Sequence, residues 1–308
     1  MGMYYPQSKC MGLTIFDYED DLDLDLFQGN DHQENFLFRN DGNGSFTEVA
    51  KKAGVAVNDK GIPTGSMHGS IGDIDGDGLI DLLVTDLRYG ALYRNIGNGL
   101  FEDITDRSGV ATLFSGKGEW GAILFDYDND TDLDIFSANG TAEELILQPQ
   151  LLLENDGMGN FSDVGRYYGE YFREKRSGRA AAVVDYDNDG DLDLVVSHID
   201  LKASAALLRN DNNTGNHWLG ITLKGRQGPV STVAARISVE IAGKKIVRIN
   251  QPGNTYLSFN DPRIHFGLGT ASRIDKLEVQ WIDGTSNHLQ DIEADRYITI
   301  IQGIGIKE

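Results

Sequence analysis

The sequence predicts an all-β protein that contains four copies of one repeat and a different C-terminal region. Three observations support this prediction: four rows of alternating carboxylates, short apolar segments around each row, and glycine-rich turns between further apolar segments. The apolar segments are only four or five residues long and are rich in Val, Ile, Leu and Phe. Such segments are typical of strands rather than helices.

The carboxylate rows begin at Asp17, Asp73, Asp126 and Asp185, so the copies lie 56, 53 and 59 residues apart. In the third copy the segment GAILF precedes the row and the segment LDIF follows it. Each row is therefore predicted to form the turn between two strands.

A second hairpin follows each row in the first three copies, at residues 36–49, 92–104 and 152–164. Its Asn-Asp-Gly and Gly-Asn-Gly centres supply the positive φ angles that tight hairpins need. Two hairpins make four strands, and four-stranded units at this kind of period are typical of β-propeller blades. The fourth copy breaks off after residues 206–216.

The predicted domains are therefore propeller blades over residues 1–215 and a second domain over residues 216–308. Alternating apolar segments and the turns at residues 242–243 and 283–284 predict a small β-sandwich or barrel for the second domain. Trp120, Trp218 and Trp281 are expected in packing positions rather than as platforms for sugars.

One polar cluster of the second domain, Asp261-Pro-Arg263-Ile-His265, has two interpretations. Arg263 and His265 contact a ligand, or the loop is stabilised by its own hydrogen bonds, which we favour. Gly267 and Gly269 are expected to serve tight turns.

Charge is concentrated in the first domain. Residues 1–215 carry 39 acidic and 16 basic residues, whereas the rest of the chain is slightly basic. The four rows hold 20 of the 48 acidic residues, so most of the net charge of −21 comes from the rows and not from the rest of the surface. The absence of a basic patch argues against nucleic-acid binding. The sequence contains no run of 18 apolar residues, so it does not predict a segment that inserts into a membrane. The single cysteine, Cys10, permits no intrachain disulfide.

Carboxylates at every second position suit a chain that curls around a divalent cation, and all-oxygen ligation favours Ca²⁺. We expect up to four ions, one per row. The predicted side-chain ligands, at positions 1, 3, 5 and 9 of each row, are Asp17, Glu19, Asp21 and Asp25; Asp73, Asp75, Asp77 and Asp81; Asp126, Asp128, Asp130 and Asp134; and Asp185, Asp187, Asp189 and Asp193. The predicted backbone carbonyl ligands, at position 7, belong to Asp23, Leu79, Asp132 and Asp191.

An EF-hand would need a glutamate at position 12, where this chain has Gln28, Val84, Ser137 and Val196. The rows also differ at position 6, where a glycine best tolerates the sharp turn: Gly78 and Gly190 are favourable, and Leu22 and Thr131 are not. We therefore predict that the first loop, which also has Glu19 in place of an aspartate, binds calcium most weakly.

Residues 120–140 and 179–198 resemble FG-GAP/VCBS repeats, the calcium-binding blades of integrin-α-like β-propellers. Residues 216–225, 235–249, 255–269 and 274–284 resemble the ASPIC/UnbV domain, and the combination is similar to the cartilage acidic protein family. The family usually has Ile-Gly-Ala-Arg where this chain has Val233-Ala-Ala-Arg236. Family propellers usually have about seven blades and this chain shows four, so we expect it to be the C-terminal portion of a longer protein whose N-terminus, with any signal peptide, is missing here. The alternative is a closed ring of four blades.

The resemblance implies a non-catalytic calcium-binding protein that is secreted or on the cell surface. Its expected partner is an extracellular protein or a glycan, bound in adhesion or recognition. Two alternatives stay open: a calcium-dependent propeller enzyme such as a polysaccharide lyase, or an accessory protein of a biosynthetic pathway. His68, His198 and Tyr89 are the few candidates for catalysis, and no nucleophile–base motif surrounds them.

Overall fold

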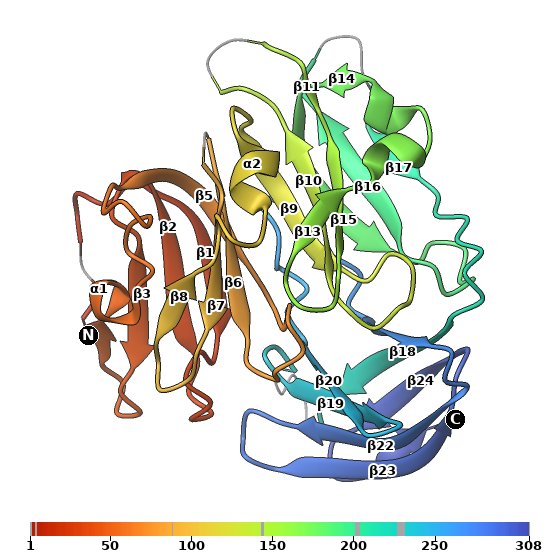
Figure 1. Cartoon of the computed structure of the whole chain (residues 1–308). Helices are drawn as coiled ribbons and strands as arrows, with labels where there is room; N and C mark the ends of the chain where they lie inside the picture. The colour runs from red at the N-terminus through yellow and green to blue at the C-terminus, as the bar shows by residue number, and fades with distance from the viewer. Residues whose placement is uncertain are drawn as a thin grey trace.

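The computed structural model describes residues 2–3, 5–87, 89–142, 145–200, 204–226 and 232–307. Four antiparallel units follow one another along the chain, the first two joined in one eight-stranded sheet, and a pair of four-stranded sheets from the last third of the chain packs beneath them (Figure 1). The chain is nearly all β, as predicted. No helix among the described residues is long and apolar enough to cross a membrane.

Each carboxylate repeat folds as one blade, whose strands run in order from the inside to the outside. Blade 1 contains β1 (Cys10–Phe16), β2 (Asp25–Gln33), β3 (Phe36–Asn40) and β4 (Phe46–Glu48); blade 2 contains β5 (Thr64–Gly72), β6 (Asp81–Asp86), β7 (Ala91–Asn95) and β8 (Phe101–Asp103); blade 3 contains β9 (Glu119–Phe125), β10 (Asp134–Asn139), β12 (Leu151–Asn155) and β13 (Phe161–Asp163); and blade 4 contains β15 (Gly178–Val184), β16 (Asp193–His198) and β17 (Ala206–Leu208). The predicted hairpins are thus confirmed.

Short elements connect the blades, and the sequence analysis did not predict them. They are α1 (Ala50–Ala53), α2 (Val110–Phe114), the 3₁₀ turns η1 (Gly165–Tyr167) and η2 (Tyr171–Arg173), and the pair β11 (Gln148–Pro149) and β14 (Lys175–Arg176). Blades 1 and 2 are also joined where β2 pairs with β5 near the strand ends.

Apolar side chains fill the space between successive blades. Phe16, Leu82 and Phe101 belong to the cluster between blades 1 and 2, and Leu83 and Ile135 belong to the next cluster. A third cluster joins blades 3 and 4. Burying such side chains stabilises the row of blades by about 1.5–3 kcal/mol for each large side chain.

The first blade has an exposed outer face. Ile15 is 41% exposed, whereas Ile71 and Leu124, at the same register in blades 2 and 3, are 4% and 8% exposed. Leu13 is 50% exposed, whereas Ala122, at the same register in blade 3, is buried.

The last blade also has an exposed outer face. Val195 and Leu207, which pair across β16 and β17, are 39% and 53% exposed. Their counterparts in blade 2, Leu83 and Leu92, are fully buried. The four blades therefore form an open arc rather than a closed ring.

The last third of the chain forms a β-sandwich, one of the two predicted alternatives. One sheet has the order β21 (Ile264–Gly269), β18 (His217–Lys224), β24 (Arg296–Ile301), β25 (Gly305–Lys307); the other has the order β20 (Lys244–Ile249), β19 (Arg236–Ile241), β22 (Arg273–Gln280), β23 (Ser286–Glu293). Trp281 is buried between the sheets, and Trp120 and Trp218 are only 9% exposed, so all three tryptophans pack as predicted.

The loop of residues 250–262 leaves the sandwich and crosses the inner strands of the blades. The Asn254 side chain donates to the Ile71 carbonyl and accepts from its N–H at 2.7 and 2.6 Å. Thr255 donates to the Ala181 carbonyl, and the Asp261 N–H donates to the Val183 carbonyl. The sandwich thereby connects β5 of blade 2 to β15 of blade 4.

Two expectations about backbone conformation meet different outcomes. Ala234, where the family usually has glycine, has a φ of 61°, so the backbone keeps the conformation that favours glycine. Gly267 was expected in a tight turn, and that prediction is wrong. It lies inside β21, where a Cβ atom would approach Asp126 Oδ2 to 2.1 Å, so close packing explains the glycine. Gly269 ends the same strand with a positive φ.

Candidate metal centres

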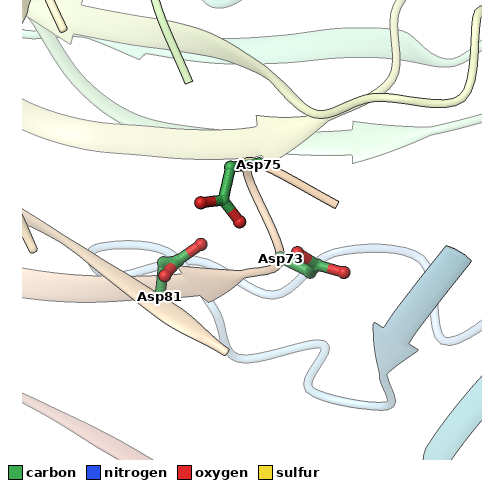
Figure 2. A group of neighbouring side chains, drawn as sticks. All are labelled: Asp73, Asp75 and Asp81. Atoms are coloured by element: carbon green, nitrogen blue, oxygen red, sulfur yellow. The ribbon is translucent and has the colours of Figure 1, made fainter. Parts of the chain in front are cut away.

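Three of the four carboxylate loops bring three aspartates together. Each residue of a triad offers an oxygen within 4.8 Å of the others, and the triads could hold metal ions. They are Asp73, Asp75 and Asp81; Asp126, Asp128 and Asp134; and Asp185, Asp187 and Asp193. Figure 2 shows the first triad gathered where β5 ends and β6 begins. Positions 1, 3 and 9 therefore converge in each triad.

The loop backbone holds the first carboxylate in place. In the third loop Asp126 accepts hydrogen bonds from the N–H groups of Asp130 and Thr131, at 3.1 and 3.0 Å. Asp185 accepts equivalent bonds from Asp189 and Gly190. The chain therefore curls around position 1, as alternating ligands require.

The last carboxylate connects the loop to the next hairpin. Asp81 accepts from the Ile74 N–H and from the Asn95 N–H, at 2.9 and 2.7 Å. Asp134 makes the same pair of bonds with Tyr127 and Asn155. Position 9 is thus both a candidate ligand and a hydrogen-bonded part of the blade.

Three carboxylate oxygens of the loops remain without a hydrogen-bond partner among the described residues, although they are buried. They are Oδ1 of Asp73, Asp128 and Asp132. A buried carboxylate oxygen without a partner costs a few kcal/mol, so each calls for a partner. A hard divalent cation fits these oxygen donors, and calcium takes six to eight of them at flexible geometry.

The electrostatics of the loops support the same fit. Burial, with help from neighbouring carboxylates, raises the pKa of Asp81 to about 8 and that of Asp128 to about 6. Burial likewise raises the pKa of Asp126 to about 7 and that of Asp132 to about 8. Two charged carboxylates at this separation repel by about 3–4 kcal/mol at an effective dielectric constant near 20. A bound cation would reverse the sign of this interaction.

Position 5 lies outside all three triads. Asp77, Asp130 and Asp189 each accept a hydrogen bond from the N–H group of the residue at position 7. The proposed roles of these side chains, and of the position 7 carbonyls of Leu79, Asp132 and Asp191, stay predictions.

The first loop forms no triad among the described residues. Asp17 and Asp25 keep the backbone bonds of positions 1 and 9. Asp21 accepts from the N–H group of Asp23, and Glu19 lies 3.9 Å from Arg39. This difference is in line with the prediction that the first loop is the weakest site.

Arginines beside the loops pair with the candidate metal ligands, and the sequence analysis missed them. Arg94 pairs with Asp75 and Asp77, and Arg209 lies 3.7 Å from Asp187. Arg39, Arg94 and Arg209 occupy the same register, directly before the asparagine of the second hairpin. That repeated Arg-Asn pair was the signal in the sequence. Blade 3 has Glu154 there, which adds to the raised pKa of Asp128.

The C-terminal sandwich docks on the carboxylate loops through further arginines. Arg236 donates to Asp20 in the first loop and to the Gly78 carbonyl in the second. Arg248, which is 9% exposed, donates to the Thr131 carbonyl and lies 4.0 Å from Asp126. The basic side chains of the sandwich thus face the acidic ends of the blades.

The polar cluster at residues 261–265 belongs to the same interface. Arg263 donates to Asp261, as a self-stabilised loop requires, and also to the Asp185 carbonyl and to Asn188 in the fourth loop. His265 lies within hydrogen-bond distance of Asn129, at 2.6 Å. Neither predicted interpretation, ligand contact or a self-stabilised loop, included the further role of Arg263 and His265, which is to attach the sandwich to the carboxylate loops.

The fourth loop makes the tightest of these contacts. Tyr297 donates to Asp185 Oδ2, and a Cβ atom at Gly190 would come within 1.9 Å of the Trp218 ring. Gly190 also has a φ of 94°, so both conformation and packing require glycine there.

The three candidates for catalysis lie apart in the fold. His68 is buried on β5, and burial lowers its pKa to about 4. Tyr89 follows β6, and burial raises its pKa to about 12. His198 ends β16 and lies 2.9 Å from the Tyr171 hydroxyl. Among the described residues, no hydrogen bond joins any two of the three.

Comparison with known proteins identifies both kinds of unit. Residues 17–84 and 73–137 match the FG-GAP-like repeat, and residues 225–307 match the domain described as ASPIC and UnbV. The resemblance seen in the sequence is thus confirmed.

Among curated proteins, the chain is 28% identical over 279 residues to cartilage acidic protein 1 of Mus musculus and to that of Homo sapiens. The match covers 84% of this chain and 40% of the mouse protein, so the chain spans less than half the length of these relatives.

Among solved structures, a lectin of Agrocybe aegerita that recognises non-reducing terminal N-acetylglucosamine matches with a TM-score of 0.34 and 20% identity, over 64% of this chain and 51% of the lectin. The V. cholerae biofilm matrix protein Bap1 matches with a TM-score of 0.35 and 13% identity, over 94% of this chain and 60% of Bap1. Scores this low inform neither the fold nor the function.

Proposed function

Since this chain joins FG-GAP-like repeats to an ASPIC and UnbV domain, the combination of the cartilage acidic protein family, we propose that it is a non-catalytic calcium-binding protein that acts outside the cell. The observation that carries the proposal is the set of three aspartate triads, two of which include a buried oxygen without a partner among the described residues, on Asp73 and on Asp128. The curated relatives are named for cartilage, a tissue composed largely of extracellular matrix, which supports the location.

The role that we assign to calcium is structural. Each triad would hold one ion, with further oxygens from positions 5 and 7. The triads are Asp73, Asp75 and Asp81 and their counterparts in loops three and four. The ion would supply positive charge where three carboxylates meet. This chain's own residues do the rest: position 9 fixes the next hairpin, and the loop carbonyls receive Arg236, Arg248 and Arg263.

The partner that we propose is an extracellular protein or a glycan, bound on the surfaces that the loops hold in place. The four near-copies of one loop support scaffolding over catalysis, because a catalytic site needs unique geometry.

Calcium titration of the full chain tests the proposal. We expect calorimetry to detect three sites of higher affinity and a weaker site in the first loop. Thermal unfolding in excess EDTA should begin at least about 10 °C lower than in calcium, because each ion at one hundred times its Kd adds about 2.7 kcal/mol.

Matched variants make the test specific. Asp75→Asn, Asp128→Asn and Asp187→Asn should each remove one site, whereas Asp59→Asn, an acidic residue outside the loops, should remove none. An unchanged melting temperature in EDTA, or equal calcium stoichiometry in all four variants, would overturn the proposal. A first loop that binds calcium most tightly would contradict only the predicted ranking.

A further inference from the structure

The third carboxylate loop (loop three, residues 126–134) differs from the others in the residue that lies beside its position 3. In blades 1, 2 and 4 an arginine directly precedes the asparagine of the second hairpin. In blade 2 this arginine, Arg94, forms ion pairs with Asp75 and Asp77 at 2.5 and 2.9 Å, so positions 3 and 5 of loop two have a cationic partner. In blade 3 the corresponding residue is Glu154, and the charge at this place is reversed.

The register of β12 places Glu154 against loop three. The N–H group of the next residue, Asn155, donates to Asp134 at position 9 at 2.9 Å, and the same bond is made in blade 2 at 2.7 Å. Burial, Asp130 and Glu154 together raise the pKa of Asp128, at position 3, to about 6, so the last two carboxylates lie close together. Among the described residues the Glu154 side chain forms no hydrogen bond and no ion pair. Its oxygens are therefore available to a cation.

Loop three also holds two of the three buried loop oxygens that lack a hydrogen-bond partner among the described residues. They are Oδ1 of Asp128 and Oδ1 of Asp132. In loop two the carboxylate at position 3 is paired with Arg94, and only Asp73 has such an oxygen. The presence of Glu154 in place of an arginine thus leaves more buried oxygen donors without a partner at loop three than at loop two.

Positive charge reaches loop three from the sandwich instead. Arg248 donates to the Thr131 carbonyl at 3.1 Å and lies 4.0 Å from Asp126. Lys244 donates to the Thr131 hydroxyl at 2.5 Å. These contacts are made at positions 1 and 6, and in the described part of the chain neither basic side chain bonds to Glu154. The sandwich therefore compensates part of the charge of the loop and leaves the side of Glu154 available.

We propose that Glu154 is a further ligand of the ion in loop three, and that it makes this loop the tightest of the four and the most selective for calcium over magnesium. The inference rests on the proposed calcium binding and names the residue that sets affinity and selectivity at one site. An additional carboxylate raises the number of oxygens toward the six to eight that calcium takes, whereas magnesium requires a smaller octahedral set. Glu154 thereby supplies the carboxylate that an EF-hand has at position 12, where loop three has Ser137.

Backbone conformation alone predicts a different ranking of the loops. Thr131, at position 6 of loop three, has a φ of 98°, whereas glycine occupies this position in loops two and four. By that criterion loop three should bind calcium more weakly than loops two and four. A third loop that binds most tightly therefore requires a contribution from outside the loop, which Glu154 supplies.

Calorimetric titration of the metal-free full chain with calcium locates the tightest site. Asp128→Asn should abolish that site, whereas Asp75→Asn and Asp187→Asn should leave it in place. Glu154→Gln should leave the number of bound ions unchanged and weaken the tightest site at least about tenfold, which corresponds to about 1.4 kcal/mol.

Glu154→Asp separates a ligand from a nearby charge. Aspartate keeps the negative charge but is one methylene shorter, so a ligating role predicts that calcium binding at loop three weakens at least about threefold. Titration in excess magnesium gives a second measurement. The preference of the tightest site for calcium over magnesium should fall in Glu154→Gln and in Glu154→Asp, because a charge that is not a ligand would act on both ions alike.

The reciprocal exchange in blade 2 tests the same idea without altering loop three. Arg94→Glu should bind calcium at loop two about tenfold more tightly than Arg94→Gln, which removes the arginine but supplies no carboxylate. If Glu154→Gln does not fold, this pair of variants decides the question. Equal calcium affinities of the two variants would contradict the role assigned to a glutamate at this register.

Three other outcomes would overturn the inference while leaving calcium binding itself intact. They are a tightest site that survives in Asp128→Asn, an unchanged affinity in Glu154→Gln, and wild-type affinity with wild-type selectivity in Glu154→Asp. Absence of calcium binding in the wild-type chain would overturn the proposed function as well. Failure of the inference is therefore distinguishable from failure of the proposed function.

Discussion

Position 6 of each carboxylate loop has a positive φ, whichever residue occupies it. The angle is 71° at Leu22, 88° at Gly78, 98° at Thr131 and 94° at Gly190. Only glycine adopts this conformation without steric cost, so loops one and three carry local strain that loops two and four avoid. The affinity ranking predicted from the sequence rests on this residue-scale difference.

Gly78→Ala should lower the free energy of unfolding by about 1 kcal/mol, because only the conformational cost changes. A Cβ atom at Gly78 would have as its nearest neighbour Arg236, at 3.9 Å. Urea unfolding measures the effect. Gly253→Ala is the control, since that glycine has neither a positive φ nor a neighbour within 4 Å, and it should change little. Equal effects of the two substitutions would contradict the assignment of strain.

His68 should make the protein less stable in acid. Burial lowers its pKa to about 4, from 6.5 for a free histidine. The unfolded chain therefore binds the proton more readily, and stability present above pH 6.5 is lost as the pH falls toward 4. The loss amounts to about 3 kcal/mol at most.

Urea unfolding in saturating calcium at pH 7 and pH 4.5 compares wild type with His68→Gln. The variant should lose less stability than wild type between the two pH values. A pH dependence that is the same in both proteins would show that His68 does not titrate in this way.

At the scale of the element, one asparagine joins each blade to the blade before it. Asn155 donates to the Ile74 carbonyl of blade 2 at 2.8 Å and to the Leu133 carbonyl of its own loop at 3.0 Å. Asn95 bridges Tyr18 and Ile80 in the same way, and Asn210 bridges Tyr127 and Leu192. The carbonyl at position 2 of one loop is thus bound by the next blade.

Asn155→Ala should cost about 2–4 kcal/mol of stability, because it leaves buried carbonyls and N–H groups without partners. Asn40→Ala is the matched control. Asn40 Nδ2 donates to the Leu24 carbonyl of its own blade at 3.4 Å, and the described chain has no blade before it. Its cost should be about 1 kcal/mol. Equal costs in chemical denaturation would argue against the bridge between blades.

The second hairpins were predictable because their turn chemistry is local: Asn-Asp-Gly and Gly-Asn-Gly centres determine the turn wherever they occur. The triads were also predictable, since positions 1, 3 and 9 repeat four times. The docking of Arg236, Arg248 and Arg263 on the loops could not be predicted, because no periodicity links residues that lie 75 or more positions apart. Gly267 shows the same limit: its neighbour Asp126 is distant in sequence, so a packing glycine looked like a turn glycine.

At the scale of the whole molecule, Arg248 is the buried positive charge between blades and sandwich. Asp126 and Asp73 are its charged neighbours, and burial lowers its own pKa. Bound calcium would neutralise the same carboxylates, so the two cations are expected to substitute for each other in part.

Arg248→Met should therefore lower the free energy of unfolding by about 3 kcal/mol in EDTA and by less in saturating calcium. Bound calcium neutralises the carboxylates that the substitution leaves unpaired, whereas in EDTA nothing does. Urea unfolding in both conditions measures the difference. Arg296→Met, at the exposed end of β24, is the control and should change stability by less than about 0.5 kcal/mol in either. An equal loss of stability in calcium and in EDTA would contradict the idea that Arg248 and bound calcium partly substitute for each other.

The loop of residues 250–262 gives the fold a definite order of assembly. While the chain is still being synthesised, blades 2 and 4 can emerge and pair their strands before that loop exists. Until it arrives, the backbone groups of Ile71 and Val183 that it binds must be satisfied by water, and Trp120 lacks the ring of Tyr256 against which it packs. The central contacts of blades 2 and 4 therefore depend on a segment that is synthesised after both blades.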